Sequence, residues 1–138
     1  MAVLDGDQAA LLEEFRSKVA LRFAHSETKG KVKEWLSTRL TCLPGGCPPE
    51  RFVLNRIVSG NFDDLPALLG ADHDSLVEAF AEASALEDAH EIFHLLGEKI
   101  HLSSDEIEQV LCRYVVAKSP EAFQELFDRL VTLLGDGA

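Results

Sequence analysis

The stretch Ser103-Ser-Asp-Glu-Ile-Glu-Gln-Val-Leu-Cys-Arg-Tyr114 decides the fold class of this chain. It opens with the capping-box pattern, in which the Ser103 side-chain oxygen accepts the amide of Glu106 and the glutamate reaches back to the serine amide. Apolar residues then recur at three- and four-residue spacing, which is the period of a helix with one buried face. The predicted buried side is made of Ile107, Val110, Leu111 and Tyr114.

Similar helix signals occur on both sides of this stretch. Ser84-Ala-Leu-Glu87 repeats the capping-box pattern and predicts a helix that runs through Leu96. Ser119 and Pro120 suit the cap and the first helical position, so they predict the start of a last helix. The second half of the chain is therefore expected to consist of short helices that begin at recognisable caps.

The first half of the chain shows further amphipathic segments. One helix is predicted from near Asp7, and a second one around Trp35, which we expect to be the apolar anchor of this half. The apolar side of the first helix is predicted to hold Leu12, Phe15, Val19 and Phe23. No segment shows the sustained period-two alternation of a strand. The sequence therefore predicts an all-α fold, a compact irregular bundle of seven or eight short helices joined by short turns.

Length and loop signals predict one domain. A chain of 138 residues is long enough to bury one hydrophobic core, so residues 1–138 are expected to form a single helical domain. The segment 41–49 holds three prolines and a Gly-Gly pair, which forbid a continuous helix. This loop is predicted to separate an N-terminal pair of helices from the acidic C-terminal helices, the first of which starts at Pro49.

The net charge of −11 is distributed unevenly. Residues 1–60 hold 9 Lys/Arg and 7 Asp/Glu, whereas residues 61–138 hold 4 Lys/Arg and 17 Asp/Glu. Such an acidic surface repels phosphate backbones and attracts basic proteins. We therefore expect a protein partner with a basic surface and no nucleic-acid ligand.

The remaining composition favours a soluble protein of a reducing compartment. The opening Met1-Ala-Val-Leu-Asp5 lacks the pattern of a secretory signal, and no window is apolar enough for a membrane span. An intracellular and cytoplasmic protein is expected. Three cysteines are an odd number, which favours reduced thiols. The sequence leaves open whether Cys42 and Cys47 form a disulfide in the loop, and Cys112 is expected to be partly buried and inert.

The sharpest chemical motif is His90-Glu-Ile-Phe-His94, an H-E-x-x-H pattern inside the helix predicted to start at Ser84. Two histidines four residues apart lie one turn apart on the same helical face, so both imidazoles reach one zinc ion. The segment resembles the active helix of the zinc metalloproteases, which implies Glu91 as the base that deprotonates a metal-bound water. His101 lies on the same stripe and is a candidate third ligand if the helix continues past Gly97.

The motif departs from that family and has two competing interpretations. In the long protease motif the last histidine falls where this chain has Ile100, and no sheet is predicted to align a substrate. The pairs Glu87-x-x-His90 and Glu91-x-x-His94 also match the spacing of di-iron helical bundles, which makes iron the alternative to zinc. The structural interpretation places the histidines at the border of a buried face, beside carboxylates.

The last helix is the main candidate for partner binding. Its apolar residues cover more of the helical circumference than one core-facing side requires, so the surplus is predicted to form an interface. The residues predicted to bind the partner are Phe123, Phe127, Leu130, Leu133 and Leu134. The leading interpretation is a non-enzymatic protein-interaction module, adaptor or small subunit, without a cofactor. A helical metal-binding hydrolase is the alternative, and self-association is left open.

Overall fold

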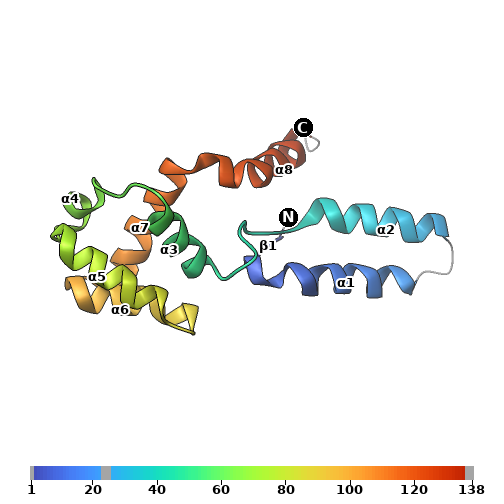
Figure 1. The fold of residues 1–138 in the computed structure, drawn as a ribbon. Coiled ribbons are helices and arrows are strands. Elements are labelled where there is room, and N and C mark those ends of the chain that lie inside the picture. The colour runs from blue at the N-terminus through green and yellow to red at the C-terminus, as the bar shows by residue number, and fades with distance from the viewer. Residues whose placement is uncertain (1, 23–25, 136–138) are drawn as a thin grey trace. The chain divides into compact units, whose positions relative to one another are not determined.

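A computed structural model describes residues 2–22 and 26–135 of the chain (Figure 1). The described chain is 77% helical, with eight α-helices and one small two-stranded parallel sheet. The all-α prediction is therefore confirmed, and so is the predicted number of helices. Phe23, which was predicted on the apolar side of the first helix, lies outside the described residues. None of the described helices combines the length and the apolar character that crossing a membrane requires.

The chain divides into two compact units, which are described separately. The terminal unit consists of Met1–Cys47 together with Glu121–Ala138, and the central unit consists of Pro48–Pro120. The boundary near residue 47 falls inside the loop predicted over residues 41–49. The single domain expected over residues 1–138 stays a prediction.

The terminal unit is a helical hairpin with a short sheet at its base and one further helix. In chain order its elements are β1 (Ala2–Leu4), a 3₁₀ turn η1 (Gly6–Gln8), α1 (Ala9–Leu21), α2 (Ser26–Arg39), β2 (Leu40–Cys42), all but the first residue of a 3₁₀ turn η3 (Pro120–Phe123), and α8 (Gln124–Gly135). α1 and α2 pack against each other and bury Leu12 and Leu36 between them. The predicted helix near Asp7 thus begins as a 3₁₀ turn.

The small sheet corrects the prediction of a chain without strands. β1 and β2 run parallel with Ala2 opposite Leu40, and the Leu43 amide extends the pairing by donating to the Leu4 carbonyl at 2.7 Å. Each strand has only three residues, which is too short to show a period-two pattern in the sequence. β2 also takes the first two residues of the loop predicted over 41–49. Gly6 is required beside this loop, because a Cβ there would meet the Cys47 carbonyl oxygen at 2.6 Å.

The central unit contains five α-helices around one apolar core. Its elements are α3 (Pro49–Ser59), α4 (Leu65–Leu69), α5 (His73–Ser84), a 3₁₀ turn η2 (Ala89–Glu91), α6 (Ile92–Ile100) and α7 (Ser104–Lys118). The side chains that are almost completely buried are Leu54, Leu65, Leu76, Ile92, Leu96, Ile107, Leu111 and Val115. Because the core draws on every helix of the unit, the unit encloses a core of its own.

The caps show which helix starts were predicted correctly. Ser103 forms both hydrogen bonds of the capping box with Glu106 at the start of α7, and Pro49 is the first residue of α3, so both predictions are confirmed. The capping box predicted at Ser84 is wrong. The Ser84 hydroxyl instead donates to the Phe80 carbonyl at 2.7 Å, in the last turn of α5. A serine near a helix end can bond backward in this way.

Two polar side chains, Arg51 and Tyr114, connect the helices of the central unit through hydrogen bonds. Arg51 at the start of α3 donates to the carbonyl oxygens of Ala83, Ser84 and Leu86, where α5 ends. Tyr114 on α7 donates to Asp64, the residue before α4, and to the Asn61 carbonyl at 3.1 Å. Burial and the bond to Asp64 raise the pKa of Tyr114 to about 12. These bonds supply partners to backbone carbonyls that helix ends leave unpaired.

Candidate protein-interaction surface

The last helix, α8, carries apolar residues on two adjacent sides. At about 100° per residue, positions three and four apart share a side of the helix. One side, the inner row, consists of Leu126, Leu130 and Leu133. The other side, the outer row, consists of Phe127, Val131 and Leu134, and lies roughly a quarter of a turn away. Together the two rows make nearly half of the circumference apolar.

The terminal unit does not bury either row completely. The inner row is half-buried, whereas Phe127, Val131 and Leu134 of the outer row are 42%, 69% and 76% exposed. No residue of α8 is buried. A surface helix of a globular protein normally buries its apolar stripe against the core. The outer row is thus an apolar surface that the described part of the terminal unit leaves uncovered.

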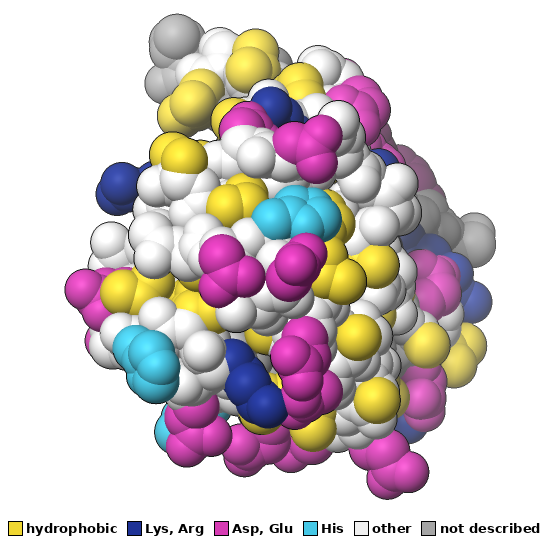
Figure 2. Space-filling model, turned by 60° about the vertical axis from the view of Figure 1, so that its left-hand side comes forward, with side chains coloured by type: hydrophobic (Ala, Val, Ile, Leu, Met, Phe, Trp, Pro, Cys, Tyr) yellow, Lys and Arg dark blue, Asp and Glu magenta, His cyan; other side chains and the backbone are white. Residues whose placement is uncertain are grey.

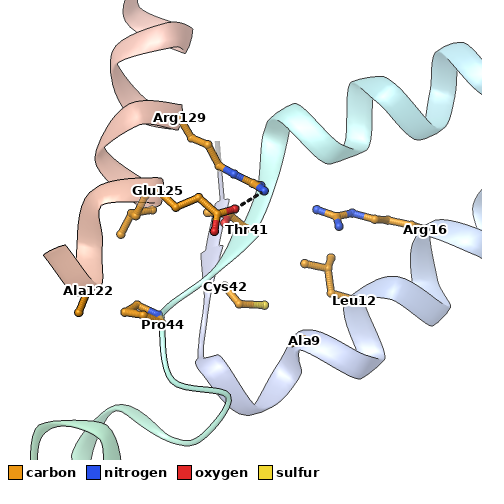
Figure 3. Close-up of a pocket in the computed structure, with 10 residues that line it drawn as sticks. Ala9, Leu12, Arg16, Thr41, Cys42, Pro44, Ala122, Glu125 and Arg129 are labelled. Carbon is orange, nitrogen blue, oxygen red and sulfur yellow. Dashed lines mark hydrogen bonds and ion pairs between the residues drawn. The ribbon is translucent and has the colours of Figure 1, made fainter. Parts of the chain in front are cut away.

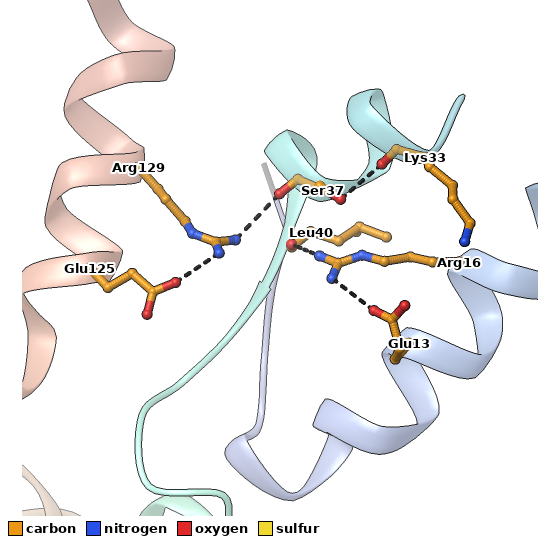
Figure 4. A network of polar contacts seen from close by, with 7 residues as sticks. All are labelled: Glu13, Arg16, Lys33, Ser37, Leu40, Glu125 and Arg129. Atoms are coloured by element: carbon orange, nitrogen blue, oxygen red, sulfur yellow. Dashed lines mark hydrogen bonds and ion pairs between the residues drawn. The ribbon is translucent and has the colours of Figure 1, made fainter. Parts of the chain in front are cut away.

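Few polar contacts hold α8 to the rest of the terminal unit. Arg129 forms an ion pair with Glu125 at 2.7 Å within α8, and its Nη1 donates to the Ser37 carbonyl oxygen near the end of α2 at 3.3 Å (Figure 4). On the other side of β2, Arg16 of α1 donates to the Leu40 carbonyl and lies 3.6 Å from Glu13. The two arginines therefore bind backbone carbonyls at the junction of α2 and β2.

A cavity of about 250 Å³ lies beside the start of α8 (Figure 3). Its wall includes Leu12, Thr41, Cys42, Pro44, Ala122 and Leu126, together with the two arginines. Leu126 belongs to the inner row, which explains in part why that row is only half-buried. The Arg16 Nε is also buried without a hydrogen-bond partner, which costs free energy that a fully packed unit avoids.

The terminal unit has a small core and many exposed apolar side chains. Among the described residues its buried apolar side chains are Leu12 and Leu36, whereas the central unit has eighteen. Eight of the twelve large apolar residues that are exposed belong to the terminal unit: Val3, Leu11, Phe15, Leu21, Trp35, Phe127, Val131 and Leu134. The described part of the terminal unit thus leaves many of its large apolar side chains exposed to solvent.

Trp35 is exposed, so the prediction that it anchors the core is wrong. The indole is 58% exposed, and the neighbouring Leu36 takes the buried position between α1 and α2. Consecutive residues on a helix point about 100° apart, so burying Leu36 turns Trp35 away from α1. The Arg39 guanidinium lies 5.7 Å from the Trp35 ring centroid. Phe15, also expected inside, is likewise exposed.

The central unit carries most of the negative charge. It holds 14 Asp/Glu and 5 Lys/Arg, a net charge of −9, whereas the terminal unit has a net charge of −2. Figure 2 shows acidic side chains spread over the face that it presents, with few Lys or Arg among them. Lys99 and Lys118 are engaged with Glu82 and Asp64, each at 2.7 Å. The central unit thus presents a strongly acidic surface.

We compared the chain with protein families, curated proteins and solved structures. No family model, curated protein or solved structure matches it.

The histidine motif does not lie on one continuous helix. His90 and Glu91 belong to the 3₁₀ turn η2, whereas His94 belongs to α6. His101 ends α6 in the left-handed conformation, with φ of 60°, so the predicted helical continuation past Gly97 stops at Ile100. Asp88 interrupts the helix predicted from Ser84, because its carboxylate accepts the His90 amide and starts η2. η2 then leads directly into α6 at Ile92.

The motif histidines are exposed and lie beside carboxylates. His90 Nδ1 is 3.1 Å from Glu50, and His94 Nε2 is 3.4 Å from Glu98. Within residues 2–22 and 26–135, no group of three or more His, Cys, Asp or Glu side chains is placed to hold a metal ion. His90, His94 and His101 as zinc or iron ligands, and Glu91 as a base, stay predictions without a geometric argument in their favour.

Two of the cysteines belong to different units. Cys42 lies in β2 and Cys112 in α7, and both are free thiols of intermediate exposure. Burial raises the pKa of the Cys112 thiol, which disfavours the reactive thiolate.

The predicted partner-binding residues differ in exposure. Phe127 and Leu134 are exposed, whereas Phe123, Leu130 and Leu133 are half-buried. The Phe123 and Phe127 rings lie 6.3 Å apart, which joins η3 to the outer row. The residue set also omitted Val131, although its spacing of four residues from Phe127 places it in the same row.

Proposed function

We propose that the chain is a protein-interaction module and not an enzyme, and that its binding surface is the outer row of α8. The observation that carries the proposal is a helix with apolar residues on two sides and no buried residue. Fully burying one Val, Leu or Phe side chain contributes roughly 1.5–3 kcal/mol. Covering the outer row therefore offers a partner several kcal/mol, before the costs of association are subtracted.

In this proposal the negative charge of the central unit makes binding selective for basic partners. A net charge of −9 on the central unit attracts basic molecules and repels acidic ones. Long-range attraction of this kind raises association rates and weakens as salt screens it, whereas apolar contact persists in salt. The proposed partner is accordingly a protein that combines an apolar groove or ridge with basic side chains.

Paired variants test the proposal. Leu134→Glu places a charge in the outer row, and Val77→Glu places the same charge at an exposed apolar position of the central unit, 45% exposed. The tagged chain and both variants are expressed in cells that make the natural protein, and retained proteins are quantified. We expect a partner that wild type and Val77→Glu retain equally and that Leu134→Glu loses at least about tenfold. Equal retention by both variants, or no retained protein, would contradict the proposal.

A further inference from the structure

α2 carries an exposed ridge of side chains that complement those of the outer row. Glu27, Lys31, Trp35 and Arg39 follow one another at four-residue spacing along one side of α2, and all are exposed. Lys31 pairs with Glu27 at 3.0 Å, and Arg39 lies over the Trp35 ring. The centre of this α2 ridge is thus an exposed indole between two cations.

The outer row of α8 has an acidic edge. Asp128 follows Phe127 directly and stands three residues before Val131, so it borders the row on its polar side. Gln124 donates to the Asp128 carboxylate at 2.7 Å and holds it there. The α8 surface is therefore apolar with a carboxylate at its border, whereas the α2 ridge is aromatic with cations at its border.

We infer that the occupant of the outer row is a second copy of this chain, which seats its α2 ridge on α8. The inference rests on the proposed function, because it names the partner of that same surface. Arg39 of the ridge, and Asp128 and Leu134 of α8, line one groove between α2 and α8. The two surfaces therefore border the same side of the unit, and a two-fold symmetric dimer makes the contact twice. In each contact Phe127, Val131 and Leu134 cover Trp35, and Asp128 faces Lys31 and Arg39.

The geometry of the two helices suits this pairing. Phe127 and Val131 follow each other at four-residue spacing, as Lys31, Trp35 and Arg39 do on α2. Ridges of this spacing on two helices interdigitate at a crossing angle near −50°, the commonest helix packing in globular proteins. The aliphatic stems of Lys31 and Arg39 add apolar contact around the indole, while their charged ends stay hydrated at the border.

The charge distribution directs a contact between two copies to the terminal unit. That unit has 8 Lys/Arg and 10 Asp/Glu, a mixed and nearly balanced set that permits two copies to approach. Two central units, each of net charge −9, repel each other. A contact between copies is therefore directed to the terminal unit, where the exposed aromatic and aliphatic side chains also lie.

The area available predicts a weak but specific dimer. The exposed parts of Trp35 and the outer row from two copies amount to on the order of 900 Å², and their polar borders bring the total near the roughly 1,200 Å² at which specific interfaces begin. The low end of this size range is typical of weak and transient contacts, and we expect a dissociation constant on the order of 10 µM.

Sedimentation velocity on the full chain tests the dimer. Wild type is expected to change from monomer at about 1 µM to dimer at about 200 µM. Val131→Glu and Trp35→Glu are each expected to raise the dissociation constant at least about 100-fold, because a charge replaces a contact that the symmetry repeats. Val77→Glu in the central unit is the matched control and leaves it unchanged. Far-UV circular dichroism verifies that each variant is folded.

An exchange of charges tests the orientation of the contact. Asp128→Lys and Arg39→Glu each bring like charges together in both contacts of the dimer, so each is expected to weaken self-association. In an equimolar mixture of the two variants, both contacts regain opposite charges, and a mixed dimer forms about tenfold more tightly than either variant alone. Equal association in the mixture and in its components would overturn the α2–α8 pairing.

The outcomes separate this inference from the proposed function. A wild type that stays monomeric up to about 200 µM overturns the second copy as partner, and the comparison of Leu134→Glu with Val77→Glu in cells still decides whether another protein covers the outer row. A dimer that survives Val131→Glu and Trp35→Glu overturns the inferred surface.

Discussion

Replacing Gly97 by alanine in α6 is predicted to destabilise the chain, although the same change usually stabilises a helix. A Cβ on Gly97 would stand 2.5 Å from the Leu102 carbonyl oxygen, closer than real Cβ contacts come. The Leu102 amide donates back to the Gly97 carbonyl at 3.0 Å, as does the amide of His101. Relieving the overlap therefore moves a backbone turn and strains two hydrogen bonds.

The magnitude follows from two opposing effects. Alanine is favoured over glycine by about 1 kcal/mol inside a helix. Overpacking against a fixed neighbour costs about 1–3 kcal/mol, and weakening a hydrogen bond adds about 1 kcal/mol. Because the obstacle is backbone and not a flexible side chain, we expect Gly97→Ala to lower the free energy of unfolding by about 2 kcal/mol.

Urea unfolding measures this change, with Gly30→Ala as the control. Gly30 lies inside α2, and a Cβ there meets nothing within 4 Å, so its replacement should stabilise α2 by about 1 kcal/mol. Circular dichroism follows both variants, and the single tryptophan, Trp35, reports on α2 by fluorescence. A Gly97→Ala chain that is as stable as wild type, or more stable, would refute the steric reasoning.

Three further predictions concern the polar contacts of the central unit. Arg51→Ala should lower the free energy of unfolding by about 2 kcal/mol, because carbonyls at the end of α5 lose a charged donor. As a control, replacing the exposed Arg113 should change the free energy of unfolding by less than about 0.5 kcal/mol. Ser103→Ala should cost about 1 kcal/mol in urea unfolding, and a cost near zero would exclude the capping box. The single tyrosine, Tyr114, should titrate near pH 12 by absorbance at high pH. Its folded pKa is raised, so its stabilising contribution is complete below pH 10 and is lost as the pH rises through about 12; a midpoint near 10 in the folded chain would contradict this.

Local chain chemistry made most helices predictable. The capping box at Ser103 and the proline that begins α3 each depend on a few neighbouring residues, and the sequence shows those residues directly. The box at Ser84 failed because two local options compete there. A serine either caps the following helix or bonds to the preceding one, and tertiary contacts from Arg51 fix the second option.

Long-range features were less accessible from the sequence. The pairing of β1 with β2 joins residues 38 positions apart and leaves no local pattern. For α8 the excess of apolar residues was visible, since it depends on helical period alone. The burial of Trp35 was predicted wrongly because Trp35 and Leu36 are adjacent on the helix, and the sequence does not show which of them faces α1. The packing of α1 against α2 decides that Leu36 is the buried residue.

The most direct test of the central claim is hydrogen–deuterium exchange of the wild-type chain at two concentrations. α8 has no buried residue, so its amides should exchange rapidly in the monomer at about 1 µM. At about 200 µM, a second copy covering the outer row should slow exchange in α8 and around Trp35 in α2, and leave the central unit unchanged. Exchange in α8 that is the same at both concentrations would contradict the claim that a second copy of the chain covers this surface.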